Sequence, residues 1–219
     1  MPKKVDHEQR RSHIVEALLR IAGERGLEAV SLREVAAEAG VSMGAVQHYF
    51  ASKDEMLRYA MRHWLSFTVH QRFTRAVQAR LAGADVSDPA VVLHAVAAAY
   101  LPHDEESRAN AKVALAFIGR AADEPAIAEA LRPAHAGLLD VVGRILSGGA
   151  PGVGEPLTGR PAPDGVRRFI ALLDGLRLHV LAGAVAYEDA LGLLDRYLSE
   201  TLSEALVDMP GPPAVRRGP

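Results

Sequence analysis

The chain has 219 residues and a formal net charge of −2, so no general excess of basic residues indicates a nucleic-acid partner. Hydrophobic residues make up 49% and charged residues 24% of the sequence, a balance typical of globular proteins rather than disordered ones. The sequence contains no cysteine, which excludes disulfides, thiolate metal sites and cysteine nucleophiles.

No segment has the features of a targeting or membrane-spanning sequence. The chain starts Met-Pro-Lys-Lys and lacks the apolar stretch of a signal peptide. The most apolar segment, residues 90–101, contains His94 and falls short of the ~20 residues that cross a bilayer. We therefore expect a cytoplasmic protein without a membrane partner.

Helical periodicity runs through most of the chain, whereas alternating strand patterns are nearly absent. We therefore expect an all-α fold. Serine residues suited to an N-cap mark three helix starts, and Ser31 and Ser52 are each followed three residues later by glutamate, as in a capping box. The predicted helices cover residues 7–25, 31–39, 42–50, 52–81, 87–101, 104–120, 125–146, 164–186 and 188–207.

Two segments near the C-terminus are expected to lack regular structure. Ten of the 19 residues from 147 to 165 are glycine or proline, which neither a helix nor a strand tolerates well, so this stretch is expected to be an exposed loop. The last segment, residues 210–219, is rich in proline and glycine and is expected to be a disordered tail.

The segment from Ser31 to Lys53 has the pattern of a helix-turn-helix. One short capped helix is followed by a break at residues 40–42 and then by a second short capped helix. A helix of this kind fits the major groove of DNA while the preceding helix crosses the backbone. Helical hairpins also occur in bundles of every function, so the spacing alone leaves both interpretations open.

The residues around this pattern resemble the DNA-binding domain of the TetR family of bacterial transcriptional regulators. The resemblance extends from about His7 to Tyr59. Its components follow the family's order and spacing: Gly26, the turn Ala39-Gly40-Val41-Ser42, and Tyr49-Phe50 followed by Ser52-Lys53. It implies a helix-turn-helix domain at residues 1–56, a helical ligand-binding and dimerisation domain at 57–209 and a tail at 210–219.

A second, shorter resemblance concerns the C-terminal part. Leu173-Asp174-Gly175-Leu176, followed by residues 191–198, is similar to the last two helices of the subgroup that includes the choline-responsive betaine repressor.

The resemblance implies that side chains of the second and third helices, and of the start of the fourth, contact operator DNA. The alternative for each is an ordinary solvated helix surface or, for Ser31, a helix cap alone. Val46 and Phe50 lie four residues apart and are expected to point into the core. The expected DNA-binding residues are Ser31, Arg33, Ser42, Met43, Gly44, Ala45, Gln47, His48, Tyr49 and Lys53.

The chain departs from the family pattern at Gln47, where many members have tyrosine. Glutamine pairs bidentately with adenine in the major groove, whereas tyrosine more often touches phosphate or a thymine methyl group. The departure leaves the fold unaffected, but the operator sequence of a relative does not transfer to this chain.

The resemblance also implies a small-molecule effector held between the helices of residues 52–186. Plain core packing is the alternative for each large apolar residue there. Aromatic residues beside few acidic ones favour a substantially apolar ligand over a polycation. The expected ligand-binding residues are His63, Trp64, Phe67, His94, Tyr100, Asn110, Phe117 and Arg120.

The last two helices carry more apolar residues than one buried face requires, which predicts a second partner surface. Two such helices from each of two chains form a four-helix interface with twofold symmetry, so a homodimer is expected. Each recognition helix then meets one half-site of a palindromic operator. The apolar residues are Leu172, Leu173, Leu176, Leu178, Val180, Leu181, Leu191, Leu193, Leu194, Leu198 and Leu202.

The sequence offers no catalytic or metal-binding signature. His63 and His70 share a helix face, but no carboxylate joins them at ligand spacing, and no Gly-rich phosphate loop or Gly-x-Ser-x-Gly motif is present. We expect no cofactor, no metal and no enzymatic activity.

Two hypotheses about function remain. The first is a sequence-specific transcriptional regulator, a repressor that a small molecule releases from its operator. The alternative is a helical dimeric module that does not bind DNA, and its only support is the equal number of basic and acidic residues, nine each, within residues 1–60.

Overall fold

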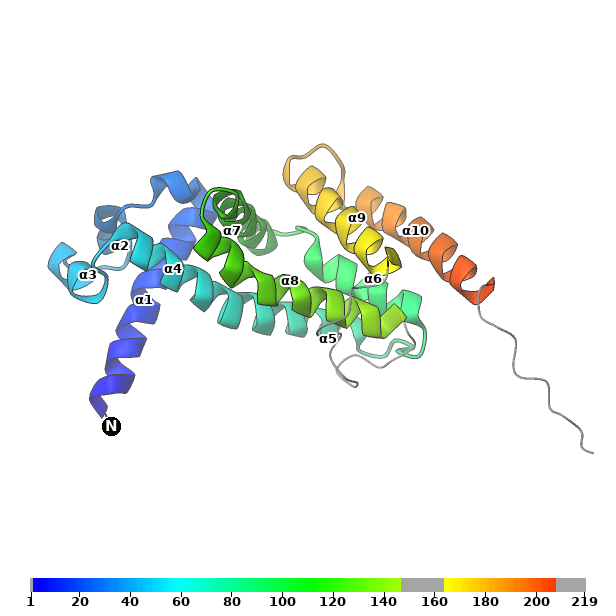
Figure 1. The fold of residues 1–219 in the computed structure, drawn as a ribbon, viewed down its shortest axis with the longest axis horizontal. Helices are drawn as coiled ribbons and strands as arrows, with labels where there is room; N and C mark the ends of the chain where they lie inside the picture. The colour runs from blue at the N-terminus through cyan, green and yellow to red at the C-terminus, as the bar shows by residue number, and fades with distance from the viewer. Residues whose placement is uncertain (1, 147–163, 208–219) are drawn as a thin grey trace, which may run out of the picture.

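The computed structural model is elongated, with α1 (Pro2–Arg25), α2 (Leu32–Glu38) and α3 (Met43–Tyr49) at one end and α9 (Asp164–Leu181) and α10 (Tyr187–Val207) toward the other (Figure 1). The structure describes the backbone of residues 2–146 and 164–207, and the side chains of residues 7–66, 71–146 and 164–200. Every regular element in the described backbone is a helix, which confirms the predicted fold class. The predicted loop, up to residue 163, and the predicted tail lie outside the described residues.

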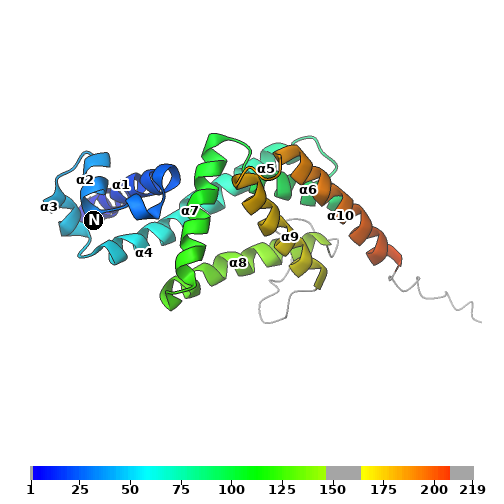
Figure 2. The ribbon, with the colours of Figure 1, turned by 90° about the horizontal axis from the view of Figure 1, so that it is seen from above.

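A long helix connects the two ends of the molecule. It consists of α4 (Lys53–His63), the π-helical stretch η2 (Trp64–Arg72) and α5 (Phe73–Leu81), which follow one another without a break. The sequence predicted one helix over these residues, and the structure adds the π-helical stretch in its middle. Figure 2 shows this helix leading from the α1–α3 end toward α6 (Pro89–Tyr100), with α7 (Glu105–Ala121) crossing it.

The turn between α2 and α3 depends on Gly40. Its φ of 64° is in the left-handed region, which favours glycine. The Gly40 N–H donates to the Ala37 oxygen at 3.2 Å, and the Val41 N–H donates to the Ala36 oxygen at 3.0 Å. This pair of bonds is a Schellman motif, so α2 ends at the glycine, as the sequence predicted.

The same motif ends α9 earlier than predicted. Gly183 has a φ of 73°, its N–H donates to the Val180 oxygen, and the Ala184 N–H donates to the His179 oxygen. The helix therefore stops at Leu181, and the prediction that it continues to residue 186 was wrong because Gly183 supplied a C-terminal cap. The first helix differs at its start, since α1 begins at Pro2 rather than at residue 7.

Buried side chains form two hydrophobic clusters. The first joins α1–α3 to α4, α7 and α8 (Pro125–Leu146), so the core of the helix-turn-helix continues into the C-terminal half of the chain. The second lies among α6, α8, α9 and α10, with α5 packed against it. The largest fully buried side chains of the first cluster are Ile14, Leu18, Ile21, Phe50, Met56, Leu57, Met61, Phe117 and Ile127.

Candidate DNA-binding interface and effector region

The three predicted serine caps are all present. Ser31, Ser42 and Ser52 each accept a hydrogen bond from the backbone N–H three residues later, at 3.1, 3.1 and 3.2 Å. The two expected capping boxes are only half formed, because the Glu34 carboxylate binds Arg25 and the Glu55 carboxylate accepts the Ala51 N–H. The serines therefore set the starts of α2, α3 and α4, while the glutamates serve contacts elsewhere.

α1 holds the helix-turn-helix in place through polar contacts. Arg20 Nε lies 2.8 Å from Glu38 Oε1, and Arg25 Nη2 lies 3.0 Å from Glu34 Oε2, so two ion pairs join α1 to α2. His13 Nε2 donates to the backbone oxygen of Ala39, 2.9 Å away, at the end of α2. These contacts fix the angle between α1 and the two helices that follow.

α3 presents a polar face to solvent and an apolar face to the core. Val46 and Phe50 are fully buried, as predicted. Ser42, Met43, Gly44, Gln47 and His48 are exposed, while Ala45 and Tyr49 are half-buried. Met43 is one of the few large apolar side chains exposed in the described part of the chain, at 39%. The predicted contact residues of this helix therefore lie together on one accessible surface.

Tyr49 lies between two histidine rings. Its ring centroid is 4.8 Å from that of His7 on α1 and 5.1 Å from that of His48, and both pairs are edge-to-face. These rings hold the end of α3 against α1. His7 was not among the predicted interface residues, although it lies at the first residue of the family resemblance.

The junction between α3 and α4 is organised around Arg11. Its guanidinium lies 4.8 Å from the Phe50 ring centroid and 4.3 Å from the Tyr59 ring centroid, and Nη2 lies 3.5 Å from Glu55 Oε1. The Tyr59 hydroxyl donates to Glu8, and burial raises the pKa of Tyr59, so this hydroxyl stays protonated. α1 and α4 are thus joined next to α3.

Arg33 and Lys53, the two cations predicted to contact DNA, take no part in the ion pairs described above. Arg33 is exposed and Lys53 is half-buried at the first turn of α4, and neither pairs with a described carboxylate. Arg11, Arg20 and Arg25 are each paired with glutamate. The equal numbers of basic and acidic residues within residues 1–60 therefore do not describe the charge of the surface around α3.

The predicted effector residues fall into separate groups. Trp64 and Phe117 are buried together in the first hydrophobic cluster, with ring centroids 5.9 Å apart. His63 lies against Glu16 of α1, 3.9 Å away, and burial lowers its pKa. The side chain of Phe67 lies outside the described residues.

Arg120 and Asn110 are both on α7 but differ in their surroundings. Arg120 Nη2 lies 3.6 Å from Asp54 Oδ1 at the first turn of α4, and it also pairs with Glu124. Asn110 is half-buried in the first half of the helix. The Arg120–Asp54 pair places the end of α7 next to the start of α4, one residue from Lys53.

Tyr100 belongs to a polar group that the sequence did not predict. Its hydroxyl donates to Asp174 Oδ1 at 2.6 Å, and its ring packs edge-to-face on Phe73, with centroids 6.3 Å apart. The guanidinium of Arg177 lies over the same ring, 4.5 Å from the centroid. The one sequence signal for this group was Arg177, a charged residue among the apolar positions Leu173, Leu176 and Val180 of α9.

His94 lies in a groove between α6 and α10. The groove has a volume of about 630 Å³, an apolar floor from these two helices and polar groups that include Arg80 and Ser199. His94 Nδ1 donates to Asp195 Oδ1 at 2.6 Å within it. The structure therefore does not bring His94 together with Trp64 and Phe117.

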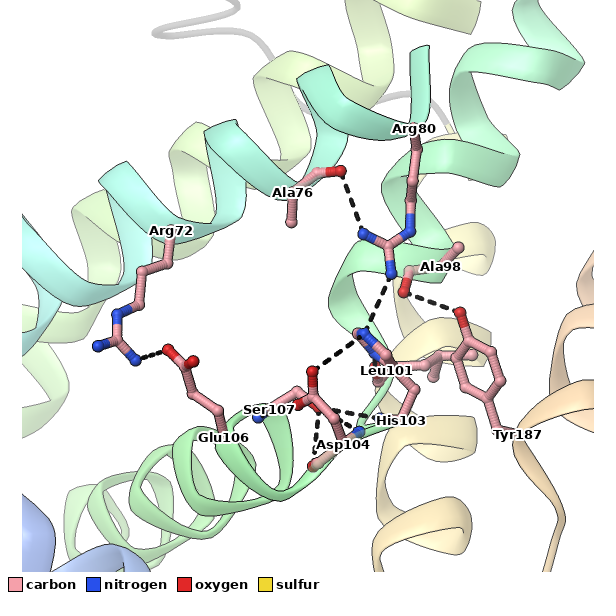
Figure 3. Close-up of polar contacts among 10 residues, drawn as sticks. All are labelled: Arg72, Ala76, Arg80, Ala98, Leu101, His103, Asp104, Glu106, Ser107 and Tyr187. Carbon is pink, nitrogen blue, oxygen red and sulfur yellow. Dashed lines mark hydrogen bonds and ion pairs between the residues drawn. The ribbon is translucent and has the colours of Figure 1, made fainter. Parts of the chain in front are cut away.

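Polar contacts join the end of η2 and α5 to α7 and to the corner between α6 and α7 (Figure 3). Arg80 Nη2 lies 3.2 Å from His103 Nε2, and Arg72 forms an ion pair with Glu106. Asp104 caps α7 through Ser107, whose hydrogen bonds lower the pKa of the aspartate. The long helix is thus anchored at its α5 end as well as beside α3.

Two further findings concern the described residues only. No three or more histidine, aspartate and glutamate side chains among them are grouped so that they could hold a metal ion. None of the described helices has the length and apolar composition that a bilayer crossing requires.

Comparisons with known proteins agree with this architecture. The model of bacterial regulatory proteins of the TetR family matches residues 14–60, and that of the C-terminal part of BetI-type transcriptional repressors matches residues 89–203. The chain therefore belongs to the TetR family of transcriptional regulators, as its sequence predicted, and is a DNA-binding regulator of transcription. Within the family, its C-terminal part is of the BetI type.

Individual relatives extend over most of the chain. The regulator PksA of Bacillus subtilis is 33% identical over 187 residues, 84% of this chain and 85% of that protein. The regulator BetI of Burkholderia thailandensis is 32% identical over 205 residues, 93% of this chain and 98% of that protein. The crystal structure of a transcriptional regulator from Rhodococcus sp. Rha1 has a TM-score of 0.68 and 34% identity, and the match covers 89% and 96% of the two chains.

Proposed function

We propose that the protein is a homodimeric repressor that binds a palindromic operator in the cytoplasm and is released by a small-molecule effector. Regulation, rather than catalysis, is its activity. The observation that carries the proposal is the exposed polar face of α3, held by α1 and joined through α4 to a helical body. We assign residues 1–56 to DNA binding and residues 57–209 to effector binding and dimerisation.

In this proposal α3 enters the major groove. Gln47 and His48 face the bases, and the small residues Gly44 and Ala45 allow close approach of the backbone. Arg33, Lys53 and the hydroxyl groups of Ser31, Ser42 and Tyr49 bind phosphates, which position the helix without reading sequence. Met43 contacts a thymine methyl group or a sugar.

Lysine 53 offers a direct test of phosphate binding. We expect Lys53→Ala to weaken binding to every duplex by a similar factor and to reduce the salt dependence by about one phosphate contact. The measurement is a gel shift or filter-binding titration at several salt concentrations, with the DNA upstream of the protein's own coding region. Lys112→Ala removes the same charge from an exposed position of α7 and serves as the control.

The outcome also decides between the two functional hypotheses. If the wild-type protein binds neither this DNA nor unrelated duplexes at low salt, the chain is a helical interaction module instead. If it binds but Lys53→Ala leaves the salt slope unchanged, α4 does not face the backbone in the proposed way.

The exposed parts of α9 and α10 support the proposed dimer. Leu173, Leu176, Val180, Leu194 and Leu198 are buried within the chain, so they account for part of the apolar excess. Leu178 and Leu193 remain 49% and 40% exposed, and large exposed apolar side chains on adjacent helices are typical of an interface. The side chain of Leu202 lies outside the described residues.

A pair of charge substitutions tests this interface. We expect Leu178→Glu with Leu193→Glu to convert the dimer to a monomer of 23.4 kDa, because twofold symmetry puts each new carboxylate into the apolar interface twice, where its burial without a partner is costly. Sedimentation velocity measures the mass. Ile118→Glu, a change of the same kind at an exposed site of α7, should leave the dimer intact. A wild-type monomer at micromolar concentration would contradict the proposal.

Release from DNA requires an effector that prefers one arrangement of the two recognition helices. An effector with equal affinity for both arrangements does not shift the equilibrium between them. A hundredfold loss of operator affinity needs a difference of about 2.7 kcal/mol between its binding free energies for the two arrangements. The buried pair Trp64 and Phe117 and the Arg120–Asp54 contact connect the body to α4. A substantially apolar ligand between α4 and α9 can therefore change the position of α3.

A further inference from the structure

Two stretches of helix connect the two hydrophobic clusters of the body, and the first of them belongs to α8. Ile127 and Leu131 of this helix pack in the first cluster, and Leu138 and Val142 pack in the second. The six residues in between, 132–137, are all exposed. Six residues make about one and a half turns, over which a helix on a protein surface normally buries one stripe. α8 therefore crosses from one cluster to the other without a buried side chain.

The same stretch of α8 contains the two kinds of residue that favour a helix least. Pro133 lies inside the helix and has no N–H to donate to the backbone oxygen of Glu129. Gly137 is not required by close packing, because a Cβ atom there would meet nothing within 4 Å. An exposed proline and an exposed glycine both weaken a helix interior, and no burial offsets the loss here. This stretch is therefore a weak part of α8.

The second connection is the long helix, which crosses between the clusters through η2. Met61 of α4 is buried in the first cluster, and Phe73 and Val77 of α5 pack on the second. π-Helical turns are rare, occur mostly as single turns at functional sites and are a known cause of helix bends. Among the described residues, only α8 and this long helix contribute apolar side chains to both clusters. Both run along the length of the molecule, and each is irregular where it crosses (Figure 1).

The start of α7 supplies polar contacts between the elements of the two clusters. Arg108 donates to the backbone oxygens of the last two residues of α9, at 3.4 and 3.0 Å. Figure 3 shows Glu106 beside Arg72, and His103 beside Arg80. The apolar side chains of α7 pack in the first cluster. Hydrogen bonds of long side chains tolerate a small change of angle better than a closely packed apolar core does, so the start of α7 is suited to be a pivot.

We propose that the protein bends across the middle of its body, at a hinge formed by residues 132–137 of α8 and by η2. The first unit comprises α1–α4, α7 and the start of α8, and the second comprises α5, α6, the end of α8, α9 and α10. The unit that carries α3 is thus larger than the DNA-binding domain proposed for residues 1–56. Because α3 lies at the far end of this unit, a small bend displaces it strongly (Figure 1). In the dimer, which rests on the proposed function, the bend changes the separation of the two α3 helices.

Because the chain has no cysteine, spin labels on two introduced cysteines can measure the bend in the full-length protein. Glu24→Cys with Arg168→Cys places one label on each unit, at exposed positions of α1 and α9. Glu24→Cys with Arg58→Cys, and Arg168→Cys with Glu188→Cys, keep both labels within one unit and serve as controls. Dilution with unlabelled protein leaves one labelled copy in each dimer. We expect double electron–electron resonance to give a distance distribution about twofold broader across the hinge than in the controls, and equal widths overturn the proposal.

Strengthening α8 at residues 132–137 tests where the hinge lies. We expect Pro133→Ala with Gly137→Ala to narrow the distribution across the hinge toward the control widths, and Gly137→Ala alone to give part of this narrowing, because alanine favours a helix most. Gly119→Ala, at an exposed glycine of α7 that also has open space around it, should raise the melting temperature as Gly137→Ala does but leave the width unchanged. An unchanged width in both α8 variants, or equal narrowing by Gly119→Ala, overturns the proposal.

Operator binding, measured in parallel with the DNA upstream of the coding region, separates this inference from the proposed function. If the α8 variants narrow the distribution but the wild-type protein binds no operator, the hinge stands and the proposed function fails. If the protein binds its operator while all distributions are equally narrow, only the hinge fails. Where both hold, we expect operator DNA to narrow the distribution across the hinge, because two half-sites at a fixed spacing select one separation of the α3 helices. An unchanged distribution on the operator would overturn the role of the hinge in DNA binding.

Discussion

Replacing Phe117 with alanine is expected to lower the free energy of unfolding by about 3–5 kcal/mol, because the ring is fully buried and leaves a cavity. This is a large fraction of the roughly 5–15 kcal/mol that stabilises a typical domain. The ring packs on Trp64 and belongs to the cluster that joins α7 to α1–α4. The substitution therefore weakens the contact between the helix-turn-helix and the body.

The measurement is urea denaturation at a fixed protein concentration, because unfolding of a dimer depends on concentration. Trp64 is the only tryptophan of the chain, so its fluorescence reports on this contact directly. Ile118→Ala, at the exposed neighbouring position, is expected to change stability by less than about 0.5 kcal/mol. A Phe117→Ala protein as stable as the wild type would show that the cluster collapses around the cavity without cost.

Replacing Gln47 with alanine is expected to change which base pair the protein prefers at one position of each half-site. The loss should be about 1–3 kcal/mol for the preferred base pair and small for the others, because the substitution removes the proposed bidentate contact to a base edge. The side chain is exposed on α3, next to the fully buried Val46. This pattern differs from the uniform loss expected for a phosphate contact.

Binding to a library of single-base variants of the operator half-site measures this preference. Gln78→Ala, at an exposed position of α5, is the matched control and should leave the binding profile unchanged. A Gln47→Ala protein that keeps the wild-type base preference would place this side chain outside the groove.

The N-terminal part of the fold could be predicted because its boundaries are local. Serine at an N-cap acts on backbone N–H groups three residues away, and Gly40 ends α2 through its own φ angle. The same chemistry explains the error at α9, since Gly183 was read as part of a helix although it forms a cap. Both helix ends are therefore set by a glycine within the local sequence.

The effector region could not be predicted in the same way. Arg177 meets Tyr100 only after α6 and α9 pack, and His94 meets Asp195 across 101 positions of sequence. Periodicity identified the apolar residues but not which polar groups face each other. The glutamates of the two expected capping boxes show the same limit, because Arg25 competes for Glu34 from another helix.

The pairing of the α1 arginines with glutamates has a consequence for how the protein is distributed over a genome. Non-specific affinity for DNA depends mainly on the number of cations that can release counterions from the phosphates. Arg11, Arg20 and Arg25 are paired with glutamates of the same chain, so they add little to the non-specific affinity for DNA. Random sites, of which a genome offers about a million or more, therefore retain fewer copies of the protein. For the proposed repressor, fewer copies are then needed to keep one operator occupied.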